Sequence, residues 1–130
     1  MKLLLDTCTF VWLACVEGRL SRVAAEMFSD PENEVYLSAV SAWEIGVKHR
    51  NGKMRLPGGI TPREFVTEAR LRHGIASLPM MENDVFPLEK LPPHHQDPFD
   101  RLLICQAIAN QMAILTPDEA IRQYPISTYW

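Results

Sequence analysis

Short apolar strands alternate with helices along this chain, and this alternation restricts its possible folds more than any other feature. KLLLD, residues 2–6, is an apolar run that ends in an aspartate, which is typical of a buried parallel strand. Further strands are predicted at 34–38, 75–79 and 113–116, with a fifth, edge strand at 126–130. Helices are predicted at 7–13, 21–30, 41–50, 61–74, 82–89 and 97–110, followed by a helical turn after residue 118.

Strands that alternate with helices imply right-handed crossovers and parallel pairing. We therefore predict an α/β fold, a single three-layer α/β/α domain over residues 1–130 with a mostly parallel sheet of about five strands. No internal repeat, low-complexity tract or long linker divides the chain. A chain of 130 residues buries roughly two thirds of its unfolded surface, so the core requires neither a disulfide nor a structural metal.

The cysteines and the charge limit the class of protein. Cys8, Cys15 and Cys105 are odd in number and form no C-x-x-C pair, which is typical of reduced thiols in a cytosolic protein. Asp6 interrupts the apolar N-terminal segment, no cleavage site follows, and no apolar run is long enough to span a membrane. We expect a soluble cytoplasmic protein without membrane association. The net charge of −3 argues against a nucleic-acid coat protein but not against a nuclease, whose metal site is acidic.

Four acidic residues are predicted to lie near one edge of the sheet. Asp6 ends the first strand, and Asp118 lies two residues beyond the strand at 113–116. Glu44 is placed in the first turn of the helix that leaves the second strand, and Asp100 in the first turn of the helix that precedes 113–116. Open parallel sheets bind ligands beyond the carboxyl ends of their strands, where the strand order reverses.

Acids in a first helical turn also have a structural explanation. Asp97 as N-cap with Asp100 at the third position makes a good helix start, and acids there interact favourably with the helix dipole. Two further pairs match a capping box, Ser41 with Glu44 and Thr116 with Glu119. Asp6 has no such explanation, because an aspartate at the end of a buried strand needs a partner and no basic residue follows nearby.

A cluster of these acids would require a cation. Two carboxylates about 4 Å apart repel by roughly 4 kcal/mol at an effective dielectric constant of about 20. Hard oxygen ligands favour Mg²⁺ or Mn²⁺, and four carboxylates can serve one or two such ions. Such a site can generate hydroxide from bound water and hold a scissile phosphate. The residues therefore predict a metal-dependent phosphoryl-transfer site.

Four segments together resemble the PIN-domain ribonucleases of the VapC toxin type: LLLDTCTFVWL, SAVSAWEIGVKHRNGKMRLP, LPPHHQDPFDRLLICQA and ILTPDEAIRQY. The resemblance runs in order from residue 3 to about residue 130. It implies a catalytic, metal-binding quartet of Asp6, Glu44, Asp100 and Asp118. It also implies that Thr116 supports this site, while Asp97 matches no quartet position and is assigned to capping or support. Cys8 stands where many relatives carry histidine.

The resemblance further implies an activity and partners. The protein would be an endoribonuclease that uses Mg²⁺ or Mn²⁺ to activate water and cut phosphodiester bonds in structured RNA such as tRNA or rRNA. It would be a homodimer, held inactive by a cognate VapB-type antitoxin that obstructs the acidic pocket. The candidates for contacts with the RNA backbone are the basic residues that follow Glu44, namely Lys48, Arg50, Lys53 and Arg55.

Other residues and other protein classes fit less well. His94 and His95 are assigned to a loop role, and Trp43 to the core rather than to base stacking. A haloacid-dehalogenase phosphatase requires a second aspartate two residues after Asp6, where this chain has Cys8. A receiver domain requires an acidic pair before the first strand, and this chain has none there. The remaining alternative is a non-catalytic PIN-like binding module for protein or RNA, which would not require mutually repelling acids.

Overall fold

The computed structural model describes residues 1–130, and its five strands form one sheet. The strands are β1 (Lys2–Leu5), β2 (Glu34–Ser38), β3 (Ala76–Leu78), β4 (Ala113–Leu115) and β5 (Thr128–Tyr129). Their order is β3-β2-β1-β4-β5, and every neighbouring pair is parallel. The predicted α/β fold is confirmed, and the sheet is parallel throughout.

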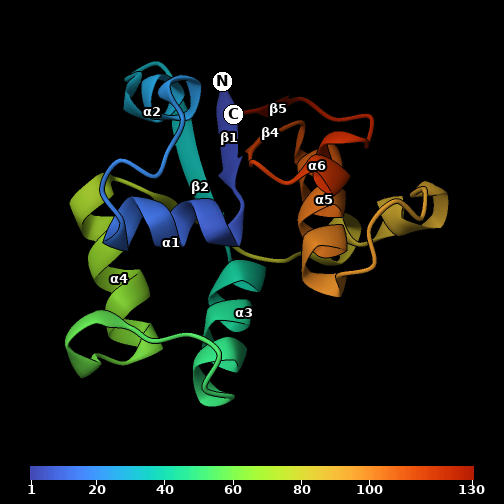
Figure 1. Ribbon diagram of the computed structural model, residues 1–130. Helices are drawn as coiled ribbons and strands as arrows, with labels where there is room; N and C mark the ends of the chain where they lie inside the picture. The colour runs from blue at the N-terminus through green and yellow to red at the C-terminus, as the bar shows by residue number, and fades with distance from the viewer.

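The chain has six α-helices: α1 (Thr7–Cys15), α2 (Arg22–Ser29), α3 (Ala39–Arg50), α4 (Pro62–His73), α5 (Pro98–Asn110) and α6 (Glu119–Arg122). Figure 1 shows α1, α2 and α4 on one side of the sheet and α5 and α6 on the other. Three short 3-10 segments, η1 (Pro57–Gly59), η2 (Glu82–Asp84) and η3 (Phe86–Lys90), complete the chain. None of the helices has the length and apolar character needed to cross a membrane.

Some predicted helix boundaries are confirmed and others are wrong. The Thr61 side chain accepts a hydrogen bond from a backbone N–H at the start of α4, and Gly74, at φ 64°, ends that helix as expected. The single helix predicted at 82–89 is instead the two segments η2 and η3, because Pro87 has no N–H with which to continue an α-helix. Helix α3 begins at Ala39 rather than Ser41, since Ser38 is its N-cap.

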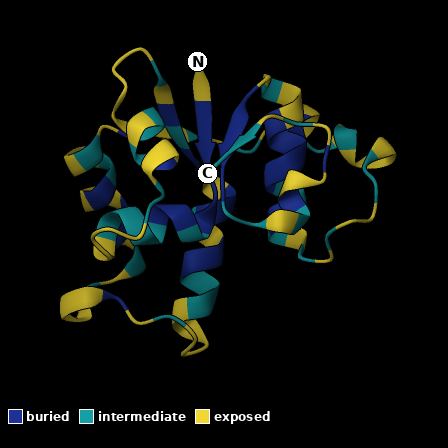
Figure 2. Cartoon of the chain, turned by 45° about the horizontal axis from the view of Figure 1, so that its top comes forward, coloured by how far each residue is buried: buried dark blue, intermediate teal, exposed yellow.

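Two apolar clusters lie on the two faces of the sheet. In β1, Leu3 and Leu5 face the cluster under α1, α2 and α4, whereas Leu4 faces the cluster under α5 and α6. All three leucines are fully buried, and each stabilises the fold by about 1.5–3 kcal/mol. Helix α3 contributes to both clusters, through Ile45 and Val40. Figure 2 shows the resulting pattern of buried strands with exposed outer helix surfaces.

The strand order reverses next to the central strand. β2 and β3 lie on one side of β1, while β4 and β5 lie on the other. The reversal therefore falls between β1 and β4, where open parallel sheets form their ligand crevice. The Asp6 N–H donates to the Leu115 carbonyl (3.3 Å), and the Thr9 hydroxyl donates to the same oxygen (2.9 Å). These bonds fix the start of α1 against the carboxyl end of β4.

Candidate functional site

A pocket of about 260 Å³ at the carboxyl ends of β1 and β4 brings the predicted acids together. Asp6 comes from the end of β1, Glu44 from α3, Asp100 from the first turn of α5, and Asp118 from the start of α6. Asp97 lines the same pocket. The structure therefore assembles four acids that are widely separated in the sequence, together with the fifth that was assigned to capping or support.

Asp6 is buried, with 4% of its surface exposed, and is held by two side-chain donors. The Thr116 hydroxyl donates to its Oδ2 (2.6 Å), and the Cys8 thiol lies 3.4 Å from the same atom. Burial raises the pKa of Asp6 and the charge of Glu44 adds to this, while the Thr116 and Cys8 hydrogen bonds oppose it. Burial and the nearby Asp6 raise the pKa of Cys8 to about 12, so this thiol remains a donor.

Thr116 connects two of the acids. It donates to Asp6, and its oxygen accepts the backbone N–H of Asp118 (3.0 Å). Asp118 is itself the N-cap of α6, because its Oδ1 accepts the N–H groups of Ala120 (2.8 Å) and Ile121 (3.4 Å). The capping box predicted for Thr116 is therefore wrong, since α6 begins only at Glu119.

Asp100 has a strongly perturbed carboxyl group. Burial raises its pKa to about 7, and the charges of Asp6, Asp97 and Glu44 add to this effect, while His95 opposes it. The helix start itself follows the sequence prediction, because Asp97 Oδ1 accepts the N–H groups of Phe99 (2.8 Å) and Asp100 (3.4 Å). A carboxyl group with such a pKa in a pocket is a frequent feature of functional sites.

The capping role of Asp97 gives a testable expectation. Asp97→Asn keeps an N-cap of similar strength, so its free energy of unfolding should match that of the wild type. Asp97→Ala removes the acceptor for the Phe99 N–H and should cost about 1 kcal/mol, measured by urea unfolding. If the asparagine variant loses as much stability as the alanine variant, the charge of Asp97 is needed rather than its capping oxygen.

Glu44 lies deeper along its helix than the sequence predicted. Because α3 begins at Ala39, Glu44 occupies the second turn and does not form the expected capping box with Ser41. Its Oε1 accepts the Thr7 hydroxyl (2.7 Å), and its Oε2 accepts the Lys48 ammonium (2.5 Å). Both oxygens of this buried carboxylate are therefore paired within the protein.

The basic residues predicted to contact RNA separate into two groups. Lys48 lines the acidic pocket as the partner of Glu44. Arg50, Lys53 and Arg55 are exposed and do not line the pocket. Of these four residues, Lys48 is therefore the one whose charge acts directly on the acids.

His95 is a site residue that the sequence analysis missed by assigning it to a loop role. Its Nε2 lies 2.9 Å from Asp100 Oδ2 and 3.1 Å from Asp118 Oδ2. The ligand atoms of these three residues lie within 4.8 Å of one another, so they could hold a metal ion. His94, in contrast, packs its ring edge-on against Tyr124, with 5.1 Å between ring centroids. The sequence signal for His95 was its place at the start of the segment HQDPFDR, two residues before the Asp97 cap.

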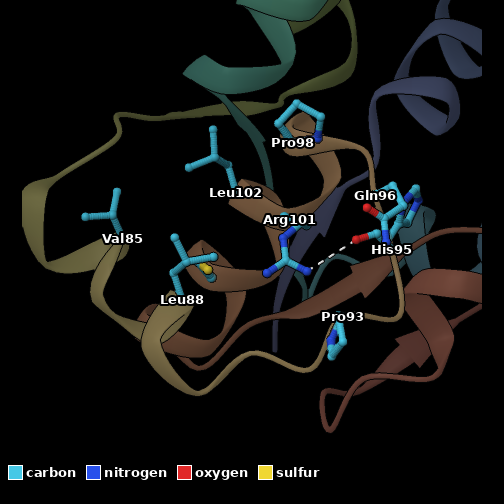
Figure 3. Close-up of a pocket in the computed structure, with 9 residues that line it drawn as sticks. Val85, Leu88, Pro93, His95, Gln96, Pro98, Arg101 and Leu102 are labelled. Atoms are coloured by element: carbon cyan, nitrogen blue, oxygen red, sulfur yellow. Dashed lines mark hydrogen bonds between the residues drawn. The ribbon is translucent and has the colours of Figure 1, made fainter.

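Two other features lie outside the acidic pocket. A larger cavity of about 580 Å³ is lined by apolar residues such as Leu88 and Leu102 and by Arg101, and it lies beside the loop that carries His95 (Figure 3). Trp43 is 66% exposed, so its assignment to the core is wrong. Trp43 lies on the face of α3 away from Ile45, which packs into the core.

A divalent cation fits the side chains of the acidic pocket. Burial raises the pKa of both Asp6 and Asp100, and each is raised further by neighbouring acids. A bound cation would favour the charged form of every carboxylate and remove this repulsion. The donors are mainly carboxylate oxygens, which favour Mg²⁺ or Mn²⁺ over softer metals.

Comparisons with known proteins agree with the fold. The family model described as the PIN domain matches residues 3–126. No curated protein matches this chain by sequence.

Among solved structures, the chain is similar to VapBC2 from Rickettsia felis bound to a promoter DNA fragment, with a TM-score of 0.74 and 12% identity over 99% of this chain and 98% of that one. It is also similar to VapBC-1 from nontypeable Haemophilus influenzae, with a TM-score of 0.61 and 16% identity over 99% and 97% of the two chains. A domain of a functionally unknown protein from Methanocaldococcus jannaschii has a TM-score of 0.59 and 16% identity over 99% and 89%. Because the family model covers nearly the whole length, the chain belongs to the PIN-domain family.

Proposed function

We propose that the protein is a metal-dependent endoribonuclease, the toxin of a type II toxin–antitoxin system, in which residues 1–130 form one nuclease domain. The observation that carries this proposal is the convergence of Asp6, Glu44, Asp100 and Asp118 on one pocket at the β1–β4 reversal. Membership of the PIN-domain family, a family of nucleases, supports the same reaction class.

In this proposal the four acids hold Mg²⁺ or Mn²⁺. When bound, the metal activates water as a nucleophile and neutralises charge on the scissile phosphate. The chain's own residues keep the acids in place. Thr116 fixes Asp6 and the backbone of Asp118, and Asp97 supports the helix turn that carries Asp100. Lys48 supplies a positive charge at the pocket, where a phosphate group would enter.

The substrate and partners are proposed from the resemblance of the motifs. Two of the similar structures are VapBC complexes, which supports a cognate VapB-type antitoxin as the partner of this chain. We infer a homodimer in the cytoplasm that cuts structured RNA such as tRNA or rRNA. The exposed residues Arg50, Lys53 and Arg55 remain proposed contacts for the RNA backbone.

The test is cleavage of a total small-RNA pool by antitoxin-free protein in Mg²⁺, Mn²⁺ or EDTA. We expect specific cuts that require metal. Asp6→Asn and Asp118→Asn should lower the rate at least about 100-fold, because even residues that only orient metal ligands contribute 10–100-fold. The amide oxygen introduced by Asp118→Asn can still cap α6, so this variant should keep its fold.

A matched control carries the same chemical change outside the pocket. Asp30→Asn lies in an exposed turn after α2 and should cleave at the wild-type rate. Cleavage that persists in Asp6→Asn and Asp118→Asn would overturn the assignment of the acids. Metal-induced stabilisation without cleavage of any RNA would instead favour the non-catalytic binding module.

A further inference from the structure

The hydrogen bonds of His95 fix which ring nitrogen carries the hydrogen. The backbone N–H of Asp97 donates to His95 Nδ1 (3.1 Å). A ring nitrogen that accepts a hydrogen bond carries no hydrogen, so in this arrangement the ring N–H group is at Nε2. The Nε2–H therefore donates to Asp118 Oδ2 (3.1 Å), and the same nitrogen lies 2.9 Å from Asp100 Oδ2.

We propose that His95 is a positioning residue and not a metal ligand. Its Nε2–H donates to Asp118 Oδ2 while the ring lies against Asp100 Oδ2, so the ring holds the Asp118 carboxylate next to that of Asp100. The role as a donor follows from the hydrogen bonds alone, and its importance for cleavage rests on the proposed function of the site.

The backbone of His95 is held by contacts that do not involve the acids. The His95 N–H donates to the Tyr124 hydroxyl (2.9 Å). The His95 carbonyl accepts from Arg101 Nη1 (3.2 Å), the hydrogen bond drawn in Figure 3. Arg101 also donates to the Pro92 carbonyl (3.3 Å) and lies 3.4 Å from the Tyr124 hydroxyl. The loop that carries His95 is therefore anchored to α5 and to Tyr124, which follows α6, so the donor is in place before any metal binds.

A metal ligand at the same nitrogen would disrupt this arrangement. Coordination through Nε2 requires its lone pair, so the hydrogen would have to move to Nδ1. There it would oppose the Asp97 N–H and leave that donor without its hydrogen-bond partner, which is unfavourable. Donation also leaves Asp100 Oδ1 free of any donor within the protein, and that oxygen can bind a cation.

Two variants test the contacts of the two ring nitrogens, Nδ1 and Nε2, independently. In His95→Asn the amide oxygen can accept the Asp97 N–H as Nδ1 does, but the side chain is too short to reach Asp100 and Asp118. In His95→Gln the longer side chain can place an amide N–H near the position of Nε2. The asparagine variant thus keeps the loop contact, and the glutamine variant restores the contact with the acids.

The first readout is the hydrogen position, measured by ¹⁵N NMR of the histidine rings at mildly alkaline pH. We expect His95 to carry its hydrogen at Nε2 both in EDTA and in saturating Mg²⁺. A hydrogen that moves to Nδ1 when Mg²⁺ is added would show coordination through Nε2 and overturn the proposal. This measurement requires no catalytic activity.

The second readout is Mn²⁺ affinity, measured from the free-ion electron paramagnetic resonance signal, with RNA cleavage followed in parallel. His95→Asn should bind Mn²⁺ about 10–100-fold more weakly than the wild type, and His95→Gln should recover most of this loss. Equal affinities in the wild type and His95→Asn would overturn the positioning role. A wild type that binds Mn²⁺ with the expected response to these variants but cuts no RNA would overturn only the proposed nuclease.

Discussion

Asp100→Asn is expected to stabilise the metal-free protein at pH 8, by about 2–4 kcal/mol, although it removes a proposed catalytic residue. The pKa of Asp100 is about 7 in the fold, against an ordinary value of 3.8. A carboxyl group with a raised pKa favours the folded state at low pH, and that contribution is lost as the pH rises from about 4 to about 7. Asparagine has nearly the same size and stays neutral, so it avoids the cost of the buried charge.

The measurement is urea unfolding in EDTA across the range from pH 4 to pH 8. The stability of the wild type relative to Asp100→Asn should fall as the pH rises and level off above pH 7. Asp30→Asn, an exposed acid changed in the same way, should follow the wild type at every pH. Parallel curves for the wild type and Asp100→Asn would contradict the raised pKa of Asp100.

Metal should offset most of this difference in stability. An ion present at about 100 times its dissociation constant stabilises a folded protein by about 2.7 kcal/mol. Millimolar Mg²⁺ or Mn²⁺ should therefore raise the melting temperature of the wild type and have much less effect on Asp100→Asn. Equal shifts in the two proteins would place the metal elsewhere.

Lys48→Met is expected to destabilise the metal-free protein, because it leaves the buried Glu44 carboxylate with Thr7 as its remaining side-chain donor. Breaking a fully buried ion pair costs about 3–5 kcal/mol, and the 41% exposure of the lysine side chain reduces the expected loss to about 1–3 kcal/mol. Saturating Mn²⁺ should shrink this loss, since a cation at Glu44 replaces the missing ammonium group.

Urea unfolding of Lys48→Met with and without Mn²⁺ measures both effects. Lys53→Met removes the same group from an exposed position without an ion pair, so its stability should match that of the wild type in both conditions. A loss in Lys48→Met that is the same with and without Mn²⁺ would exclude Glu44 from the metal site.

The architecture could be predicted from the sequence because the signals for its elements are local. Each strand is a short apolar run bounded by polar or turn residues, and β2 begins and ends where predicted. Errors arose where two local signals compete. Ser38 and Ser41 are both acceptable N-caps, and the choice of Ser38 starts α3 two residues earlier and moves Glu44 out of the first turn.

The acids of the site could be predicted because parallel strands bring their carboxyl ends to one edge. The contacts among these side chains could not. Thr7 and Glu44 are 37 positions apart in the sequence, and His95 and Asp118 are 23 apart. His95 reaches Asp118 because Arg101 holds the proline-rich loop in place. No periodicity reports such contacts, so His95 was assigned to a loop role and Lys48 to RNA binding.

The central position of β1 also determines when the site forms during translation. Thr116, the hydroxyl donor to Asp6, follows it by 110 positions, so a ribosome must extend the chain far beyond β1 before the two can meet. Until β4 emerges, one edge of β1 has no partner strand, and its unpaired backbone N–H and C=O groups are open to pairing with other nascent chains. A polypeptide released before β4 therefore lacks both the completed sheet and the acidic pocket, so the proposed cleavage activity is restricted to nearly complete chains.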